Sequence, residues 1–165
     1  MVNGKTNEPK NPITDKLNIM NKTIYLKQLQ GNTFAAKAES GHWVVMDTKQ
    51  EAGGNAGAST PKELLLMALA GCTSMDVIGI LKKKRSPVAG YECIVRGEEA
   101  EQHPKIFKTM HIEYVFYGDG LRAEDVQQAI ELSRTKYCSV SAQLSASAAI
   151  THSYVIKPAS DLQKE

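Results

Sequence analysis

Residues 60–84, TPKELLLMALAGCTSMDVIGILKKK, form the most informative segment of the chain. From Leu64 to Leu81 this segment has one charged side chain, Asp76, and it approaches the length of a membrane-spanning helix. A helix that is apolar on every side can equally form the buried axis of a soluble core. We favour the buried helix and expect no membrane association, because the segment contains several small and polar residues and no second such segment exists.

The ends of this helix are also marked in the sequence. Thr60 can accept hydrogen bonds from the free N–H groups of the first turn, and Pro61 suits the first helical position. Glu63 stands where it completes a capping box with Thr60. Pro87 stops the helix, because the residue before a proline disfavours helical backbone. We therefore predict a long helix that begins at Thr60 and ends near Lys84.

Shorter elements are predicted on both sides of this helix, where apolar residues recur at the spacing of strands or helices. We expect strands at residues 23–30, 34–38 and 42–47, then the long helix, strands at 91–99 and 106–117, helices at 123–136 and 137–147, and a strand at 149–156. The predicted order is β(3)-α-β(2)-α(2)-β, which places the chain in the α+β class.

The length of 165 residues suits one domain. We expect a poorly ordered tail at residues 1–20, a single domain at residues 21–158 and a C-terminal tail at residues 159–165. The net charge of +2 is too balanced to predict binding to nucleic acid. Residues 1–15 lack the apolar region of a signal peptide, and three cysteines do not suggest a secreted disulfide framework. We therefore expect a cytoplasmic protein.

Three cysteines are the candidate reactive side chains. Cys72 lies in the middle of the long helix beside the small residues Ala70 and Gly71, so another element can approach its sulfur closely. Cys138 lies at the junction of two predicted helices, where the N–H groups of a helix N-terminus would lower its pKa. Cys93 lies in a predicted strand and is interpreted as a core residue. Cys72 and Cys138 could equally be small buried hydrophobic residues.

Two thiols on separate helices could form a peroxidatic and resolving pair. A thiolate that attacks a peroxide O–O bond becomes a sulfenic acid, and a second thiol condenses with it to a disulfide. An external thiol then restores the pair by exchange. This chemistry requires the Cα atoms of Cys72 and Cys138 to come within roughly 4.4–6.8 Å of each other.

Several motifs resemble those of the OsmC/Ohr superfamily, the osmotically induced and organic hydroperoxide resistance proteins. The run ASTPKELLLMALAGCTSMDV at residues 58–77, with Gly53-Gly54 before it, resembles the central helix of that family. The residues LS at 132–133 and YCSV at 137–140 resemble its second cysteine motif. VRGE at residues 95–98 and HPKIF at 103–107 resemble the hairpin between them.

This resemblance implies an OsmC-like fold in which an intertwined homodimer encloses a buried central helix. It also implies a peroxiredoxin-type activity that detoxifies organic hydroperoxides under oxidative stress, with the active site at the dimer interface. In that reaction Cys72 would attack the hydroperoxide and Cys138 would resolve the sulfenic acid, and an external thiol would be the reductant.

The chain departs from the pattern of the family's peroxidases, which use an arginine from an N-terminal strand and a glutamate early in the central helix. No arginine precedes Arg85, and lysine lacks the planar fork of arginine. Lys62 occupies the glutamate position, and Glu63 follows one residue later. On a straight helix Glu63 and Cys72 lie on opposite faces, so Glu63 is either a helix cap or a displaced active-site carboxylate. These departures resemble the YhfA-like branch of the family.

Other charged residues offer weaker candidates for the site. Asp76 lies one turn after Cys72, and as an anion it would raise a nearby thiol pKa. His42 and Asp47 belong to the third N-terminal strand. The four histidines are scattered, and no spacing typical of metal ligands or of a phosphate-binding loop is present, so we expect no metal and no cofactor. The alternative function is an OsmC-like dimer that binds a small hydrophobic or thiol-reactive ligand without turnover, or with a different thiol reaction.

Overall fold

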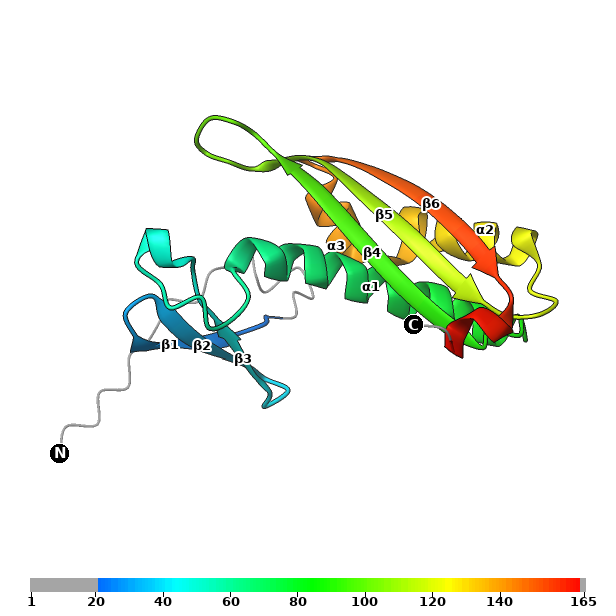
Figure 1. Cartoon of the computed structure of the whole chain (residues 1–165), viewed down its shortest axis with the longest axis horizontal. Helices are drawn as coiled ribbons and strands as arrows, with labels where there is room; N and C mark the ends of the chain where they lie inside the picture. Colours follow the sequence, from blue (N-terminus) through cyan, green and yellow to red (C-terminus); the bar gives the residue numbers. More distant parts are fainter. Residues whose placement is uncertain (1–20, 164–165) are drawn as a thin grey trace, which may run out of the picture. The chain divides into compact units, whose positions relative to one another are not determined.

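The computed structural model describes residues 21–163, which form two compact units, one ending at Ser59 and one beginning at Thr60 (Figure 1). The predicted N-terminal tail, residues 1–20, lies outside the described residues. Within the predicted C-terminal tail, Ala159–Gln163 forms a 3-10 helix. The sequence analysis expected a single domain at residues 21–158, and that the two units fold together as one domain stays a prediction.

The first unit is an antiparallel sheet of three strands in the order β1-β2-β3. Its strands are β1 (Ile24–Gln30), β2 (Thr33–Ala38) and β3 (Trp43–Met46), and each predicted end lies within one residue of the observed end. Gly31 has a φ of +54°, a left-handed backbone that suits glycine at the tight turn between β1 and β2. A 3-10 helix, Gln50–Ala52, opens the loop that follows β3.

Asp47, directly after β3, holds this loop in place. Its buried carboxylate accepts hydrogen bonds from the backbone N–H groups of Thr48 at 2.7 Å, Gly57 at 3.1 Å and Asn55 at 3.2 Å, and from the Thr33 hydroxyl at 3.1 Å. Burial raises the pKa of the carboxyl, but these hydrogen bonds outweigh it and the pKa lies below its ordinary value. Asp47 therefore organises a loop that has no apolar core of its own.

The second unit is built on the long helix α1 (Pro61–Lys83). Both hydrogen bonds of the predicted capping box are present, because the Thr60 hydroxyl accepts from the Glu63 N–H and the Glu63 carboxylate accepts from the Thr60 N–H. The helix buries one stripe of side chains at successive four-residue steps. These side chains are Leu69, Thr73, Val77 and Leu81.

A second sheet of three strands packs against this stripe. It consists of β4 (Gly90–Glu99), β5 (Phe107–Tyr117) and β6 (Ala149–Lys157), with β5 in the centre. β4 runs antiparallel to β5, whereas β6 runs parallel to it. A parallel neighbour needs a crossover, and the chain between β5 and β6 supplies it with helices. The β5 side chains that join the core with α1 alternate along the strand and are Met110, Ile112, Tyr114 and Phe116.

The crossover from β5 to β6 contains two α-helices and a wider turn between them. α2 (Ala123–Leu132) is followed by a π-helix, Ser133–Tyr137, and then by the short helix α3 (Ser139–Leu144). Side chains of α2 and α3 share one core with α1 and β5, so helices and sheet form two layers. The element order confirms the predicted β(3)-α-β(2)-α(2)-β subunit and the α+β class, while the π-helix replaces the end of the helix predicted at residues 123–136.

Within one chain, only part of the surface of α1 is buried. In the part of the chain that the structure describes, α1 is the one helix long and apolar enough to cross a membrane by length and composition. Its packing against the sheet, α2 and α3 supports a core helix instead. Outside these four buried positions, however, Leu65, Met67 and Met75 are exposed, the last at 79%. A single chain therefore leaves part of the central helix uncovered, and its enclosure by a homodimer stays a prediction.

A buried carboxylate fastens the start of α2 to the end of α1. Asp125 is 4% exposed and accepts hydrogen bonds from Lys84 at 2.9 Å, Ser86 at 2.9 Å and Arg122 at 2.9 and 3.0 Å. The Lys84 hydrogen bond is the main cause that lowers the pKa of Asp125 to about 2, with Ser86 and Arg122 adding to it against the opposing effect of burial. Lys84, in the run of lysines at the end of α1, thus has Asp125 as its ion-pair partner.

We expect Asp125→Asn to lower the thermal midpoint at pH 7 and to flatten its dependence on pH below 5. The folded-state pKa of about 2 lies below the ordinary value of 3.8, so Asp125 stabilises the fold fully above ~pH 5 and less as the pH falls from about 4 toward 2. Thermal unfolding across this pH range measures the effect. Glu124→Gln removes an exposed charge from the same helical turn and should keep the wild-type pH profile. Identical profiles for Asp125→Asn and wild type would contradict the assignment.

Candidate functional site

Two reactive side chains project from neighbouring turns of α1. Cys72 and Asp76 are four residues apart and therefore lie on the same face of the helix, next to the buried stripe. Both are half-buried. The small residues Ala70 and Gly71 precede Cys72, and a Cβ added to Gly71 would meet no atom outside the helix within 4 Å. Cys72 is thus only partly covered by the rest of the chain.

The π-helix between α2 and α3 presents the second thiol. The N–H of Cys138 donates to the carbonyl of Ser133 at 2.9 Å, which closes the wider turn. Such turns are rare and occur often at functional sites. Cys138 then becomes the N-cap of α3, where its Sγ accepts a hydrogen bond from the Ser141 N–H at 3.3 Å. The predicted helix start near Cys138 is confirmed, whereas no pattern in the sequence predicts the π-helix.

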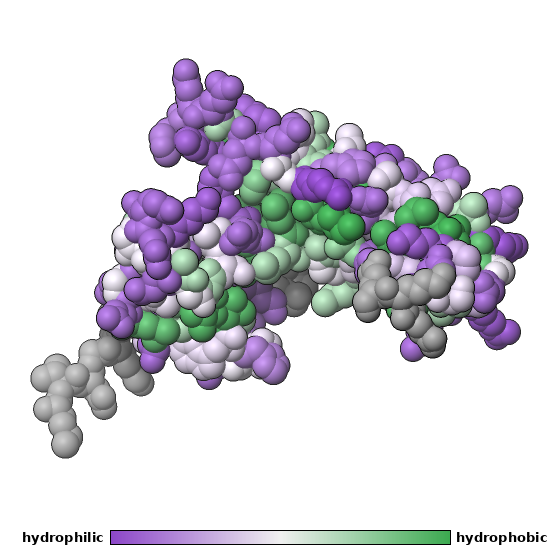
Figure 2. Space-filling model, viewed as in Figure 1, coloured by the Kyte–Doolittle hydropathy of each residue, from purple (hydrophilic) through white to green (hydrophobic). Residues whose placement is uncertain are grey.

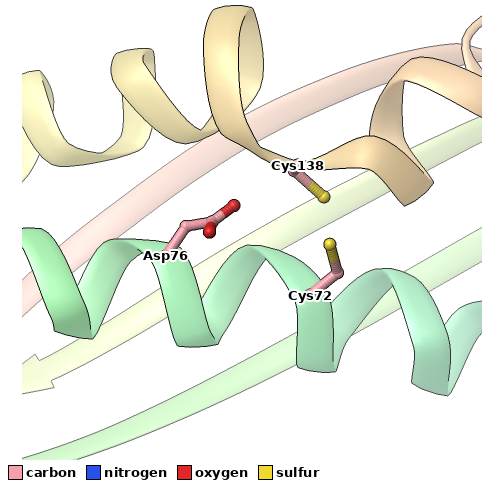
Figure 3. A group of neighbouring side chains, drawn as sticks. All are labelled: Cys72, Asp76 and Cys138. Atoms are coloured by element: carbon pink, nitrogen blue, oxygen red, sulfur yellow. The ribbon is translucent and has the colours of Figure 1, made fainter. Parts of the chain in front are cut away.

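The structure brings Cys72, Asp76 and Cys138 together. The two sulfurs and a carboxylate oxygen of Asp76 all lie within 4.8 Å of one another. In Figure 3 the sulfurs point toward each other from facing segments, and the Asp76 carboxylate points into the same space one turn along α1. Both thiols are free, and a disulfide between them would require their sulfurs to approach from within 4.8 Å to about 2.05 Å.

The thiol of Cys138 is held in its protonated form. Burial, to 3% exposure, is the main cause that raises its pKa to about 11, and the hydrogen bond and charge of Cys72 and the charge of Asp76 raise it further. The Ser141 N–H acts in the opposite direction but does not outweigh these effects. The expectation that a helix N-terminus would lower this pKa was therefore wrong, because α3 is short and the sulfur is buried beside two acidic groups.

A chain of buried hydrogen bonds fixes the orientation of Asp76. The Ser133 hydroxyl donates to Asp76 Oδ2 at 3.1 Å and lies 3.2 Å from the Thr73 hydroxyl. Thr73 is 2.7 Å from the Tyr114 hydroxyl, which is 3.2 Å from His152 Nδ1. A carboxylate can only accept, so the Ser133 hydroxyl donates to Asp76. The Thr73 hydroxyl must then donate to Ser133, and the Tyr114 hydroxyl to Thr73. The sequence analysis did not identify these four supporting side chains, which come from four elements.

His152 ends this chain as a neutral imidazole. Burial is the main cause that lowers its pKa, and the positive charge of Arg134 acts in the same direction. Its Nδ1–H donates to the Tyr114 oxygen, and the Tyr114 and His152 rings stack at 6.0 Å. Its Nε2 is buried without a hydrogen-bond partner among the described residues. In the neutral ring this Nε2 is an acceptor without a proton. Burying it unpaired costs less free energy than burying an unpaired N–H on a charged imidazolium ring would.

Glu63 lies away from the two thiols. It belongs to the capping box at the first turn of α1, and the nine residues to Cys72 correspond to about 13 Å along a helix. The neighbouring Lys62 forms an ion pair with Glu99 and donates to the backbone oxygen of Lys105 at 3.2 Å, so it fastens α1 to the β4–β5 hairpin. A catalytic role for Glu63 stays a prediction, whereas its capping role is observed.

Cys93 does not join the pair. It lies on β4 opposite Tyr114 of β5 and packs partly buried against the core, as predicted for a strand residue. It lines a surface groove of about 270 Å³ together with Glu63, Leu66 and Met67. Cys93 is therefore a matched control for experiments on the other two thiols.

Comparisons with known proteins place the chain in a family. Residues 53–153 match the family model described as OsmC-like protein. The chain belongs to the OsmC-like family. Protein YhfA of Escherichia coli K12 is 37% identical over 133 residues, which cover 79% of this chain and 95% of YhfA.

Solved structures of other OsmC-like proteins share the fold. A hypothetical protein from Aquifex aeolicus VF5 has a TM-score of 0.75 and 32% identity, over 85% of this chain and 98% of that one. The organic hydroperoxide resistance protein OsmC from Legionella pneumophila has a TM-score of 0.58 and 16% identity, over 80% and 96% of the two chains. The likeness to the Legionella protein shows a shared fold, and the similarity to YhfA agrees with the branch suggested by the sequence.

We expect Cys138 to be alkylated more slowly than Cys72 and Cys93 in the folded, reduced protein. Its raised pKa of about 11, against an ordinary 9.0, lowers its thiolate fraction near neutral pH by about 100-fold, and burial adds a steric barrier. Timed reaction with iodoacetamide, followed by peptide mass spectrometry, measures all three rates in one sample. If the three cysteines are alkylated at equal rates in the native protein, and also at equal rates in denaturant, the raised pKa of Cys138 is contradicted.

Proposed function

We propose that this OsmC-like protein reduces organic hydroperoxides through a thiol pair in which Cys72 attacks and Cys138 resolves. One observation carries the proposal: two cysteines far apart in the sequence meet within 4.8 Å, with sulfurs that point toward each other. Membership of a family that includes organic hydroperoxide resistance proteins supports the same reaction.

The environments of the two thiols support this division of roles. Cys138 is buried and protonated, which makes it a poor first nucleophile. Cys72 is half-buried and lies on a helix with small neighbours, so a substrate can reach its sulfur. Once Cys72 is oxidised, the protonated thiol of Cys138 lies beside it as the group that closes the disulfide.

The proposed reaction balances with these groups. The Cys72 thiolate attacks one peroxide oxygen, so an S–O bond forms, the O–O bond breaks, and the leaving alkoxide takes a proton to become an alcohol. Cys138 then attacks the sulfenic acid, an S–S bond forms, the S–O bond breaks, and the Cys138 proton leaves with hydroxide as water. An external thiol reductant returns two electrons by exchange. Such a cycle suits the reducing cytoplasm that we expect from the sequence.

The surface beside the thiols suits an organic substrate. A groove of about 360 Å³ reaches Asp76 and is lined by apolar and aromatic side chains as well as Lys83. The apolar and aromatic residues in that lining are Met75, Ile80, Leu132 and Tyr137. An alkyl or aryl hydroperoxide could bury its carbon chain here, which hydrogen peroxide could not.

One observation favours the second candidate, a dimer that binds a hydrophobic or thiol-reactive ligand without turnover. Lys62, which stands where the resemblance implies a glutamate, is paired with Glu99, and no arginine precedes Arg85. The charge set attributed to the family's peroxidases is therefore incomplete in this chain. Ligand binding that is equal in wild type and Cys72→Ser, with no peroxide consumed, would favour this candidate.

We expect cumene hydroperoxide to convert Cys72 and Cys138 to a disulfide, with loss of two hydrogen atoms from the intact mass. Cys72→Ser should reduce peroxide consumption by more than about 100-fold, because the nucleophile is removed. Cys138→Ser should stop at a sulfenic acid that dimedone traps on Cys72. Cys93→Ser is the matched control and should behave as wild type. The assays contain a metal chelator so that bound metal ions do not affect the result. Unchanged peroxide turnover in Cys72→Ser would eliminate the mechanism.

We also expect a homodimer, because apolar side chains remain exposed on a single chain. On the face shown in Figure 2 apolar side chains gather over α1 and β4, and over the sheet of the first unit. The exposed residues include Leu65, Met67 and Met75 on α1, and Ile24, Leu26, Trp43 and Val45 on β1 and β3. Exposed apolar side chains that gather on each of the two units in this way suggest that each unit contributes to an interface.

Light scattering should therefore give twice the chain mass of 18.0 kDa. The double substitution Leu65→Glu and Met67→Glu should shift the protein toward monomer, because it would place charges at the covered side of α1. A wild-type monomer at micromolar concentration would contradict the expectation.

A further inference from the structure

The group formed by Cys72, Asp76 and Cys138 also has the geometry of a metal site. Zinc binds thiolate at about 2.3 Å and carboxylate oxygen at about 2.0–2.2 Å in a tetrahedron. Those bond lengths place two sulfur ligands about 3.8 Å apart and a sulfur and an oxygen about 3.5 Å apart. Every pair of donor atoms here is already within 4.8 Å, and all three point into one space (Figure 3). Small side-chain rotations would complete the geometry.

The charges of this group are not balanced by the described residues. Its three acidic side chains converge, and Asp76 forms no ion pair within residues 21–163. Lys83 lines the same groove as Asp76 but makes no ion pair with it. By contrast, the buried carboxylate of Asp125 is surrounded by Lys84 and Arg122. A divalent cation would supply the positive charge that the cysteine group lacks.

The surrounding hydrogen bonds orient the donor atoms for a cation. Ser133 donates to Oδ2 of Asp76, which leaves Oδ1 available as a ligand. The Ser141 N–H points to the Cys138 sulfur and would stabilise its thiolate. Supporting hydrogen bonds of this kind commonly orient the ligands in metal sites. The polar chain through Thr73 and Tyr114 therefore holds one ligand in a fixed direction.

Ligand type and access then select the cation. Two thiolates and one carboxylate favour soft or borderline ions such as Zn²⁺ over Mg²⁺ or Ca²⁺, which prefer oxygen alone. The groove of about 360 Å³ that reaches Asp76 offers an entry path. Three protein ligands leave a fourth position for water, which is the arrangement of catalytic rather than structural zinc sites.

We propose that the reduced thiols of Cys72 and Cys138, together with Asp76, bind one thiophilic divalent cation of the Zn²⁺ type per chain. Binding releases two thiol protons as two S–metal bonds and one O–metal bond form. A disulfide offers no thiolate, so oxidation of the metal-bound pair by a hydroperoxide takes up two protons from solvent, yields disulfide, alcohol and water, and releases the cation. Metal and hydroperoxide therefore compete for the same reduced pair. The binding itself does not depend on the proposed reductase activity.

Cobalt titration of the full-length reduced protein tests the site, because Co²⁺ replaces Zn²⁺ and reports thiolate ligation by charge-transfer absorption in the near ultraviolet. Wild type should bind one Co²⁺ per chain with this absorption, and Zn²⁺ should remove it. Asp76→Asn should weaken binding at least about 10-fold. Cys72→Ser and Cys138→Ser should each reduce the charge-transfer absorption by about half or more, and Cys93→Ser should leave it unchanged.

Several results would overturn the proposal. One is the absence of charge-transfer absorption in wild type whose three thiols are shown to be reduced. Another is the same absorption and affinity in Cys72→Ser or Asp76→Asn, with circular dichroism confirming that each variant is folded. Protein in which mass spectrometry shows a complete Cys72–Cys138 disulfide should bind no Co²⁺, and persistence of binding in that oxidised protein would also overturn it. The titration contains no peroxide and the peroxide assay contains a chelator, so each function can fail separately.

Discussion

The packing of α1 against the central strand β5 is the interaction on which the rest of the second unit depends. The stripe of Leu69, Val77 and Leu81 is fully buried against this sheet, and burying each such side chain contributes roughly 1.5–3 kcal/mol. That contact sets the rotation of the helix about its own axis. Because the helix has a fixed angular step per residue, the rotation also decides where Cys72 and Asp76 point.

Thr73 connects this packing to the chemistry. It lies within the buried stripe, and its hydroxyl joins Tyr114 of the sheet to Ser133 of the crossover. Ser133 in turn holds Asp76 and begins the π-helix that delivers Cys138. A polar group buried at this depth is costly unless it is satisfied, so the three hydroxyls favour one arrangement of helix, strand and crossover. The same arrangement brings the two sulfurs together.

The carboxylates of Asp125 and Asp76 have opposite electrostatic environments. Asp125 is surrounded by cations, and its low pKa adds to stability at neutral pH. Among residues 21–163, Asp76 has a hydroxyl donor but no cation as an ion-pair partner. Burial, Cys72 and Asp76 together keep the Cys138 thiol protonated. A stabilising network tends to neutralise charge, whereas a reactive site can leave charge unpaired for a substrate or an ion. This contrast motivates both proposals for the thiol pair.

The order of elements could be predicted from local patterns, since the capping box at Thr60 and the alternation along β5 depend on neighbouring residues alone. Family membership followed from motifs around Cys72 and Cys138, which are linear in the chain. The meeting of Cys72, Asp76 and Cys138, the raised pKa of Cys138 and the π-helix could not be predicted in this way. They depend on which helix faces overlap after the crossover closes, and on how deeply each sulfur is then buried. Burial and distance between remote segments are properties of packing, and only the tertiary structure decides them.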